Sequence, residues 1–163
     1  MNVFGIVGYK NTGKTGLMER LVTDITERGF TVSTIKHAHH SFDVDHVGKD
    51  SYRHRAAGAS QVLLSSGTRW ALMSELRDAA EPPLVALLAK LDPVDLVLIE
   101  GYKTNDHPKI ETYRGVTNGT LLADTDATIL AVATDCSIDS SQPQFDLDDT
   151  TAIADFIIAQ VRL

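Results

Sequence analysis

The chain has 163 residues, a formal net charge of −7 at pH 7, 43% hydrophobic residues and 23% charged residues. This length suits a single domain spanning residues 1–163, and the acidic charge argues against a nucleic-acid surface. The single cysteine excludes an intramolecular disulfide and suits the cytoplasm, and no apolar run approaches the ~20 residues that span a bilayer.

The chain begins with an apolar strand at residues 3–7, followed by a glycine loop and a helix at residues 16–28. The loop at residues 8–15 reads GYKNTGKT, which is the G-x-x-x-x-G-K-T pattern of a phosphate-binding P-loop. Such a loop curls so that successive N–H groups, and the positive end of the helix dipole, face phosphate oxygens. We therefore expect phosphate contacts from Gly8, Lys10, Asn11, Thr12, Gly13, Lys14 and Thr15.

Two side chains of this loop have further predicted roles. Lys14 supplies a positive charge to the β- and γ-phosphates and is a candidate catalytic residue, which we expect to face solvent when the loop is empty. The Thr15 hydroxyl is placed to ligate Mg²⁺. The loop therefore predicts a Mg²⁺-nucleotide site.

A strand at residues 31–35 leads into a polar segment, residues 36–55, that is dense in ionisable side chains. Asp45 is a candidate Mg²⁺ ligand, and a histidine cluster in this segment offers nitrogen ligands for a transition metal. The alternative is a solvated, switch-like loop or a surface for a ligand or partner. The candidates for that surface are Lys36, His37, His39, Asp43, Lys49, Asp50 and Arg53.

The middle of the chain predicts a helix at residues 50–57, an antiparallel hairpin and a helix that opens at Pro82 and Pro83. The hairpin strands, residues 61–64 and 68–72, flank a turn, and we expect them to make the sheet mixed rather than purely parallel. Trp70, Leu72 and Met73 give the second strand too many apolar side chains for an exposed edge, which predicts a homodimer that covers it.

The apolar run at residues 95–99 is followed by Glu100, which gives the form of a Walker B strand. A carboxylate at the end of such a strand can reach Mg²⁺ directly or through water, or act as a base. Glu100 is therefore a candidate metal ligand and catalytic residue.

Further strands are predicted at residues 109–113 and 128–134, then a polar loop at 137–147 and a final helix. Asp135 follows the last strand, where a carboxylate can accept hydrogen bonds from guanine, so we expect it to bind the base. Cys136 is expected to be at least half-buried. The alternation of strands and helices predicts an α/β P-loop NTPase fold with a mostly parallel twisted sheet, an antiparallel hairpin and helices on both faces.

These motifs together resemble the MobB family of molybdopterin-guanine dinucleotide biosynthesis adapter proteins. The resemblance rests on the P-loop, on segments at residues 35–40, 43–45, 48–52, 57–59 and 69–73, and on Ile99-Glu100-Gly101-Tyr102-Lys103. It implies a dimeric GTP-binding protein with weak GTPase activity that assists MobA, the guanylyltransferase, and contacts the machinery that inserts the molybdenum cofactor. It also implies that the phosphate loop falls on Gly8 to Thr15 and the Walker B acid on Glu100.

Two other functions compete with this one. A small P-loop kinase acting on a nucleoside or coenzyme precursor would need a basic lid, and the residues after Pro83 carry only Lys90; Arg53, Arg55, Arg69 and Arg77 remain candidate catalytic cations. A metal-delivery GTPase would need the histidines as ligands.

Overall fold

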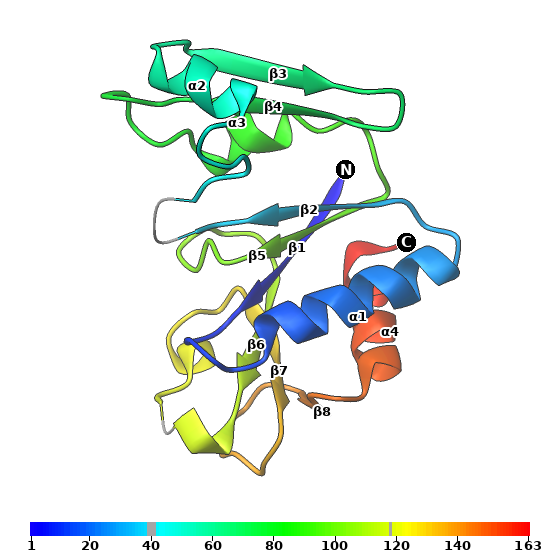
Figure 1. The fold of residues 1–163 in the computed structure, drawn as a ribbon. Coiled ribbons are helices and arrows are strands. Elements are labelled where there is room, and N and C mark those ends of the chain that lie inside the picture. The colour runs from blue at the N-terminus through cyan, green and yellow to red at the C-terminus, as the bar shows by residue number, and fades with distance from the viewer. Residues whose placement is uncertain (39–41, 118) are drawn as a thin grey trace. The chain divides into compact units, whose positions relative to one another are not determined.

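A computed structural model describes residues 1–38, 42–117 and 119–163. The chain groups into two compact units, one made of Met1–His37 with Leu91–Leu163 and the other of Ala38–Lys90. The first unit contains the P-loop and the main sheet, and the second is inserted between β2 and β5 in the sequence (Figure 1).

The main sheet of the first unit is six-stranded, and every neighbouring pair is parallel. Its strand order is β2-β5-β1-β6-β7-β8. Because all the strands run the same way, their carboxyl ends lie at one edge of the sheet, where ligands of such folds bind. The strands are β1 Asn2–Val7, β2 Val32–Lys36, β5 Leu96–Glu100, β6 Lys109–Tyr113, β7 Ile129–Thr134 and β8 Gln144–Asp146.

Two helices, α1 Lys14–Glu27 and α4 Thr150–Val161, cover one face of this sheet (Figure 1). Leu17, Leu21 and Ile25, spaced by four along α1, are fully buried in the core beneath the helices. The Asp149 side chain caps α4 by accepting a hydrogen bond from the Ala152 amide, at 3.0 Å. The first helix ends before Gly29, which has a φ of 95°.

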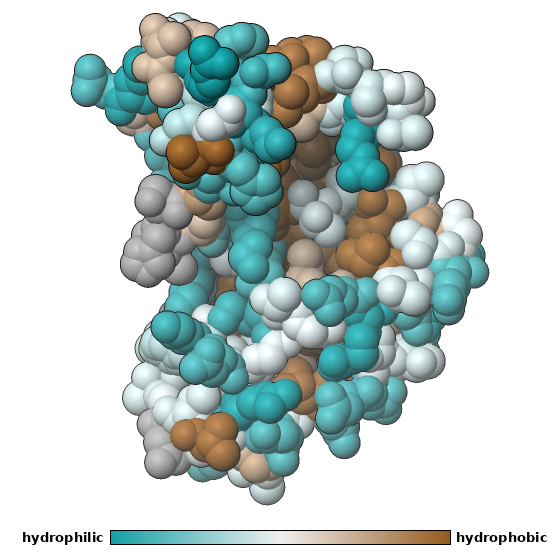
Figure 2. Space-filling view, viewed as in Figure 1, coloured by the Kyte–Doolittle hydropathy of each residue, from teal (hydrophilic) through white to brown (hydrophobic). Residues whose placement is uncertain are grey.

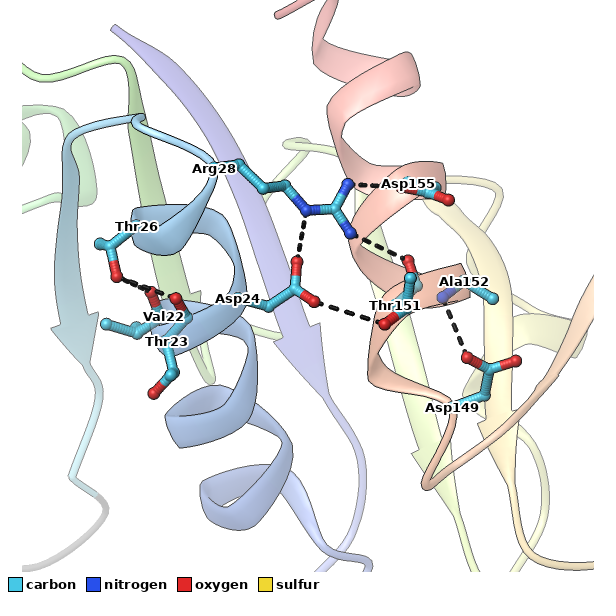
Figure 3. A network of polar contacts seen from close by, with 9 residues as sticks. All are labelled: Val22, Thr23, Asp24, Thr26, Arg28, Asp149, Thr151, Ala152 and Asp155. Carbon is cyan, nitrogen blue, oxygen red and sulfur yellow. Dashed lines mark hydrogen bonds and ion pairs between the residues drawn. The ribbon is translucent and has the colours of Figure 1, made fainter.

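A polar network joins the two helices (Figure 3). Arg28, next to the end of α1, forms ion pairs with Asp24 on its own helix, at 2.6 Å, and with Asp155 on α4. Its guanidinium also donates to the Thr151 carbonyl oxygen, at 3.5 Å. This network fixes α1, and with it the loop at the other end of that helix, against the rest of the first unit.

The opposite face of the sheet carries buried polar side chains of β6. Glu111 is fully buried and accepts hydrogen bonds from the Leu122 and Ala123 amides, at 3.1 and 2.9 Å, at the start of the 3-10 helix η2, Leu122–Asp124. Burial raises the pKa of the Glu111 carboxyl, and these backbone donors oppose that rise. Lys109 is 1% exposed and pairs with Asp126 at 2.9 Å. With η2 here and α1 and α4 opposite, helices lie on both faces, as predicted.

The second unit contains α2 Asp50–Ala56, the hairpin strands β3 Gln61–Ser65 and β4 Trp70–Ser74, and α3 Leu84–Leu88. The hairpin is antiparallel as predicted, but the expectation of one mixed sheet is wrong. Its strands form a separate two-stranded sheet, because β3 and β4 pair only with each other in the part of the chain that the structure describes.

Two other expectations need correction. The polar loop at residues 137–147 contains the short strand β8, which pairs with β7 through the register Val132↔Gln144. Its three residues, Gln144-Phe145-Asp146, alternate polar, apolar, polar, and Phe145 packs against the core, but so short a run does not predict a strand. Cys136 is exposed rather than half-buried, because it lies just beyond the end of β7. In the described ranges, no helix has the length and apolar character needed to cross a membrane.

Candidate functional site

The loop between β1 and α1 has a tightly curled backbone. Gly8 and Gly13 permit this conformation. Gly8 has a φ of 145°, and a Cβ placed on it would lie only 2.5 Å from the Thr112 carbonyl oxygen. Gly13 has a φ of 96° and caps α1. A side chain at either position would be strained, so the sequence requirement for glycine here follows from the curled backbone.

Thr12 anchors the loop to the sheet. Its hydroxyl donates to the Tyr9 carbonyl oxygen at 2.9 Å and lies 2.7 Å from the hydroxyl of Thr112 on β6. The residue is 1% exposed. Its side chain therefore has a structural role, and a phosphate contact from Thr12 would come from the backbone.

Lys14 is less exposed than expected. It is half-buried, and its Nζ donates to the Tyr9 carbonyl oxygen at 2.5 Å because the curled loop turns that oxygen toward it. Burial lowers the pKa of the Lys14 ammonium, as do Lys103 and Lys36, whereas Glu100 raises it. The ammonium thus lies across the mouth of the loop, among other positive charges.

Glu100 lies where the carboxyl ends of three neighbouring strands meet. The Thr15 hydroxyl donates to its Oε1 and Oε2, at 3.2 and 3.4 Å, and Lys36 Nζ lies 3.4 Å from Oε1. Glu100 aligns with Ile6 of β1 and with Lys36 of β2 in the sheet register. The structure therefore brings together three residues, Thr15, Lys36 and Glu100, that come from distant parts of the sequence.

An open pocket of about 520 Å³ lies over the loop. Its lining residues include a cation that the sequence did not single out, Arg114, which directly follows β6. The signal that could have found it is the strand order, because β6 lies beside β1 and both strands end at the same edge. The lining residues are Lys10, Asn11, Gly13, Lys14, Thr15, Gly16, Glu100 and Arg114.

Of the predicted residues at the start of the polar segment, His37 belongs to the first unit. Its ring stacks on that of Tyr102, with centroids 4.5 Å apart and an interplanar angle of 22°. His39 lies outside the described residues. The residues whose placement is described contain no group of three or more His, Cys, Asp or Glu side chains that could hold a metal ion.

The other predicted residues of that segment belong to the second unit. Arg55 forms ion pairs with Asp45 at 2.5 Å, with Asp43 at 2.8 Å and with Glu75 at 2.8 Å. Hydrogen bonding to Arg55 lowers the pKa of the Asp45 carboxyl. Asp45 thus has an arginine partner within its own unit, and its role as a Mg²⁺ ligand stays a prediction. Near the start of α2, the predicted surface residues Lys49, Asp50 and Arg53 are exposed.

Asp135 follows β7 and is exposed, at the same edge of the sheet as the loop. Its Oδ1 accepts a hydrogen bond from the Gly115 amide at 2.9 Å. The carboxylate therefore holds the chain that follows β6, and its predicted contact with the base remains a prediction.

Comparison with known proteins agrees with this architecture. The model of the family described as MobB, molybdopterin guanine dinucleotide synthesis protein B, matches residues 3–135. The chain belongs to the MobB family. Among MobB relatives, the molybdopterin-guanine dinucleotide biosynthesis adapter protein of Haemophilus influenzae is 39% identical over 95% of this chain and 86% of its own length. That of Escherichia coli is 36% identical over 96% and 91%.

Solved MobB structures share the fold. The MobB protein homolog from Bacillus stearothermophilus superposes with a TM-score of 0.72 at 30% identity and covers 99% of both chains. A structure of molybdopterin-guanine biosynthesis protein B gives a TM-score of 0.76 at 25% identity, over 97% of this chain and 99% of that one. These structures confirm the predicted α/β P-loop fold.

Proposed function

We propose that this MobB-family chain is a GTP-binding adapter with weak GTPase activity in molybdopterin guanine dinucleotide biosynthesis. In this role it assists the guanylyltransferase MobA, which attaches GMP to molybdopterin, and contacts the machinery that inserts the cofactor. The observation that carries the proposal is the P-loop with Lys14 across its mouth and the Thr15–Glu100 pair beside it.

The residues at this pair suit Mg²⁺. Hydroxyl and carboxylate oxygens are the hard donors that Mg²⁺ prefers, and Thr15 Oγ1 and Glu100 Oε1 are 3.2 Å apart. Bound Mg²⁺ would neutralise charge on the phosphate oxygens. Glu100 would then orient Mg²⁺ or a water molecule near the γ-phosphate, while Lys14 binds phosphate oxygens.

The hairpin supports the homodimer in this proposal. Leu63 aligns with Leu72, and Trp70 lies on the same face of the hairpin; the three residues are 61%, 45% and 63% exposed. Met73, expected beside Trp70 and Leu72, is instead half-buried on the opposite face, where it pairs with Val62. Figure 2 shows a small apolar area among more hydrophilic surface over the hairpin strands. A second copy of the chain that packs on the face of Leu63, Trp70 and Leu72 would remove these apolar side chains from water.

A small kinase is the weaker alternative. Of the arginines that could have served as its catalytic cations, Arg55 is held by three carboxylates and Arg77 donates to the Ala59 carbonyl oxygen at 3.0 Å. These contacts support structural roles for both residues within the second unit.

Calorimetric titration with GTP, ATP and GDP in the presence of Mg²⁺ tests the proposed function. We expect GTP to bind more tightly than ATP and to be hydrolysed slowly, with no phosphoryl transfer to nucleosides or coenzyme precursors. Phosphorylation of such an acceptor would favour the kinase, and a folded chain that binds no nucleotide would overturn both functions.

A further inference from the structure

Arg114 is a cation of the pocket that the proposed function does not yet use. It directly follows β6, and β6 pairs in parallel with β1, the strand that leads into the P-loop. Arg114 is therefore brought to the loop by the backbone of the sheet, and it lines the same pocket as Lys14 and Thr15.

The guanidinium of Arg114 lies against the first turn of α1. A Cβ placed on Gly13 would be 3.4 Å from Arg114 Nε and 3.5 Å from Nη2. The Nε atom is buried and has no hydrogen-bond partner among the described residues. The residue as a whole is only half-buried and lines the pocket. Its positive charge, together with the backbone N–H groups of the loop, can therefore attract an anion bound in the pocket.

The strand order shows which part of a nucleotide Arg114 can reach. β1 lies between β5, which ends in Glu100, and β6, which leads to Arg114, so these two side chains flank the loop on opposite sides. In nucleotide sites of this type Mg²⁺ bridges the β- and γ-phosphates. The γ-phosphate would then lie on the side of Glu100 and Thr15, and the nucleoside on the side of Arg114.

The surroundings of Arg114 also suit this end of the ligand. The next residue, Gly115, donates its amide hydrogen to Asp135 Oδ1 at 2.9 Å, and Asp135 follows the neighbouring strand β7. A Cβ placed on Gly115 would lie only 3.1 Å from Cys136 Sγ. The backbone after Arg114 is therefore held against the end of β7, which limits the positions that the guanidinium can take.

We propose that Arg114 is a nucleotide-binding residue that donates hydrogen bonds to a phosphate group shared by GDP and GTP, on the nucleoside side of the P-loop. This inference rests on the proposed function, since it needs a nucleotide in the loop. In this site Lys14 binds phosphate oxygens at the γ-phosphate end, and Arg114 binds them at the end nearer the nucleoside. The fork of its guanidinium can contact two phosphate oxygens at once.

The test compares the affinities of GTP and GDP, with Mg²⁺, for the wild-type chain and for Arg114→Gln. We expect the substitution to weaken both nucleotides by the same factor, about 10-fold or more, because both carry the phosphate that it contacts. Arg114→Lys keeps the charge but lacks the fork, so its affinities should fall between those of wild type and Arg114→Gln. Arg162→Gln removes the same charge at an exposed residue outside the pocket and should change neither affinity.

The outcomes separate this proposal from the proposed function. Unchanged affinities in a folded Arg114→Gln variant would overturn it, and so would a loss confined to GTP, which would place Arg114 at the γ-phosphate. If Arg114→Gln does not fold, the Arg114→Lys variant provides the test. Wild-type affinity of Arg114→Lys for both GTP and GDP would refute a contact made through the guanidinium fork. Failure of the wild-type chain itself to bind GTP or GDP would instead overturn nucleotide binding as a whole.

Discussion

Thr15 Oγ1 and Glu100 Oε1 lie 3.2 Å apart although 85 positions separate the two residues in the sequence. The first belongs to the opening turn of α1 and the second ends β5. Because β1 and β5 are neighbouring parallel strands, the loop that follows β1 and the acid that ends β5 meet at one edge. This contact joins the two parts of the predicted Mg²⁺ site and is the basis of the first prediction.

Replacing Glu100 with Gln should leave GTP binding within about twofold of wild type and lower hydrolysis by about 10-fold or more. The proposed task of the carboxylate, orienting Mg²⁺ or water, matters more in the transition state than in the ground state. Single-turnover hydrolysis alongside calorimetry measures both effects. Glu19→Gln, at an exposed position of α1, is the matched control. Equal hydrolysis rates in wild type and Glu100→Gln would make Glu100 a structural residue.

Replacing Lys14 with Ala should abolish detectable Mg²⁺-GTP binding, a loss of about 100-fold or more. The hydrogen bond from Nζ to the Tyr9 carbonyl oxygen is lost as well, but it is exposed and should cost no more than about 1 kcal/mol of stability. Calorimetry and thermal unfolding check the two effects, with Lys90→Ala as an exposed control. A folded Lys14→Ala variant with wild-type GTP affinity would rule out the P-loop assignment.

GTP should bind at least about 10-fold more tightly than ATP, with Asp135 as the residue that distinguishes the bases. Asp135 also holds the Gly115 amide, so its substitution by Ala can weaken any nucleotide by loosening that backbone. The ratio of the two affinities separates these roles. Loss of the preference in Asp135→Ala supports contact with guanine, whereas an equal weakening of GTP and ATP would show that the base is recognised elsewhere.

The chain should sediment as a dimer at micromolar concentration, and Trp70→Asp or Leu72→Asp should shift it toward the monomer. Both substitutions place a carboxylate on the exposed apolar face of the hairpin, where a packed partner would bury it at a cost. Val116→Asp makes a similar change at a residue that is 85% exposed in the first unit and should leave the dimer intact. A monomeric wild-type chain contradicts the dimer, and a dimer that tolerates both hairpin variants has its interface elsewhere.

His107 should make the chain less stable in mild acid. Burial, and secondarily Lys109, lowers the pKa of its imidazole from 6.5 to about 4. The folded state therefore prefers neutral His107, and the stability that this gives is present above pH 6.5 and is lost as the pH falls toward about 4. The expected loss is on the order of 1–3 kcal/mol.

The substitution His107→Phe tests this assignment, because both ring nitrogens are buried without a hydrogen-bond partner among the described residues and an apolar ring can replace them. Denaturant unfolding at pH 7 and pH 4.5 should show a smaller difference for His107→Phe than for wild type. The same substitution at exposed His54 should leave the wild-type difference unchanged. An undiminished difference in His107→Phe would assign the acid sensitivity to other groups.

The sequence predicted best what depends on short segments. The P-loop and the buried strand before Glu100 both depend on local patterns, and each lies where its pattern indicated. Arg114 could not be found in this way, because its place in the pocket depends on β6 lying beside β1. The same limit applies to β8, whose three residues become a strand only because β7 offers an unpaired edge.

The contacts of side chains were harder to predict than the positions of helices and strands. The sequence offered Asp45 as a Mg²⁺ ligand and Asp43 as part of a ligand or partner surface, and the structure pairs both carboxylates with Arg55. Lys14 has an acceptor within its own loop because the curled backbone supplies one. In both cases the residue types were identified correctly, while the choice among competing partners required the folded chain.

The ion pair between Lys36 and Glu100 ties the end of β2 to the end of β5, beside the phosphate loop, within the first unit. Lys36 ends β2, and the second unit begins at Ala38, two residues later in the chain. The Lys36 side chain is 60% exposed, so this pair is weak and a change of partner at Glu100 should release it easily. A nucleotide or cation at the phosphate loop would then alter the restraint on the strand from which the inserted unit leaves the sheet. The restraint that changes belongs to the first unit, at the end of β2.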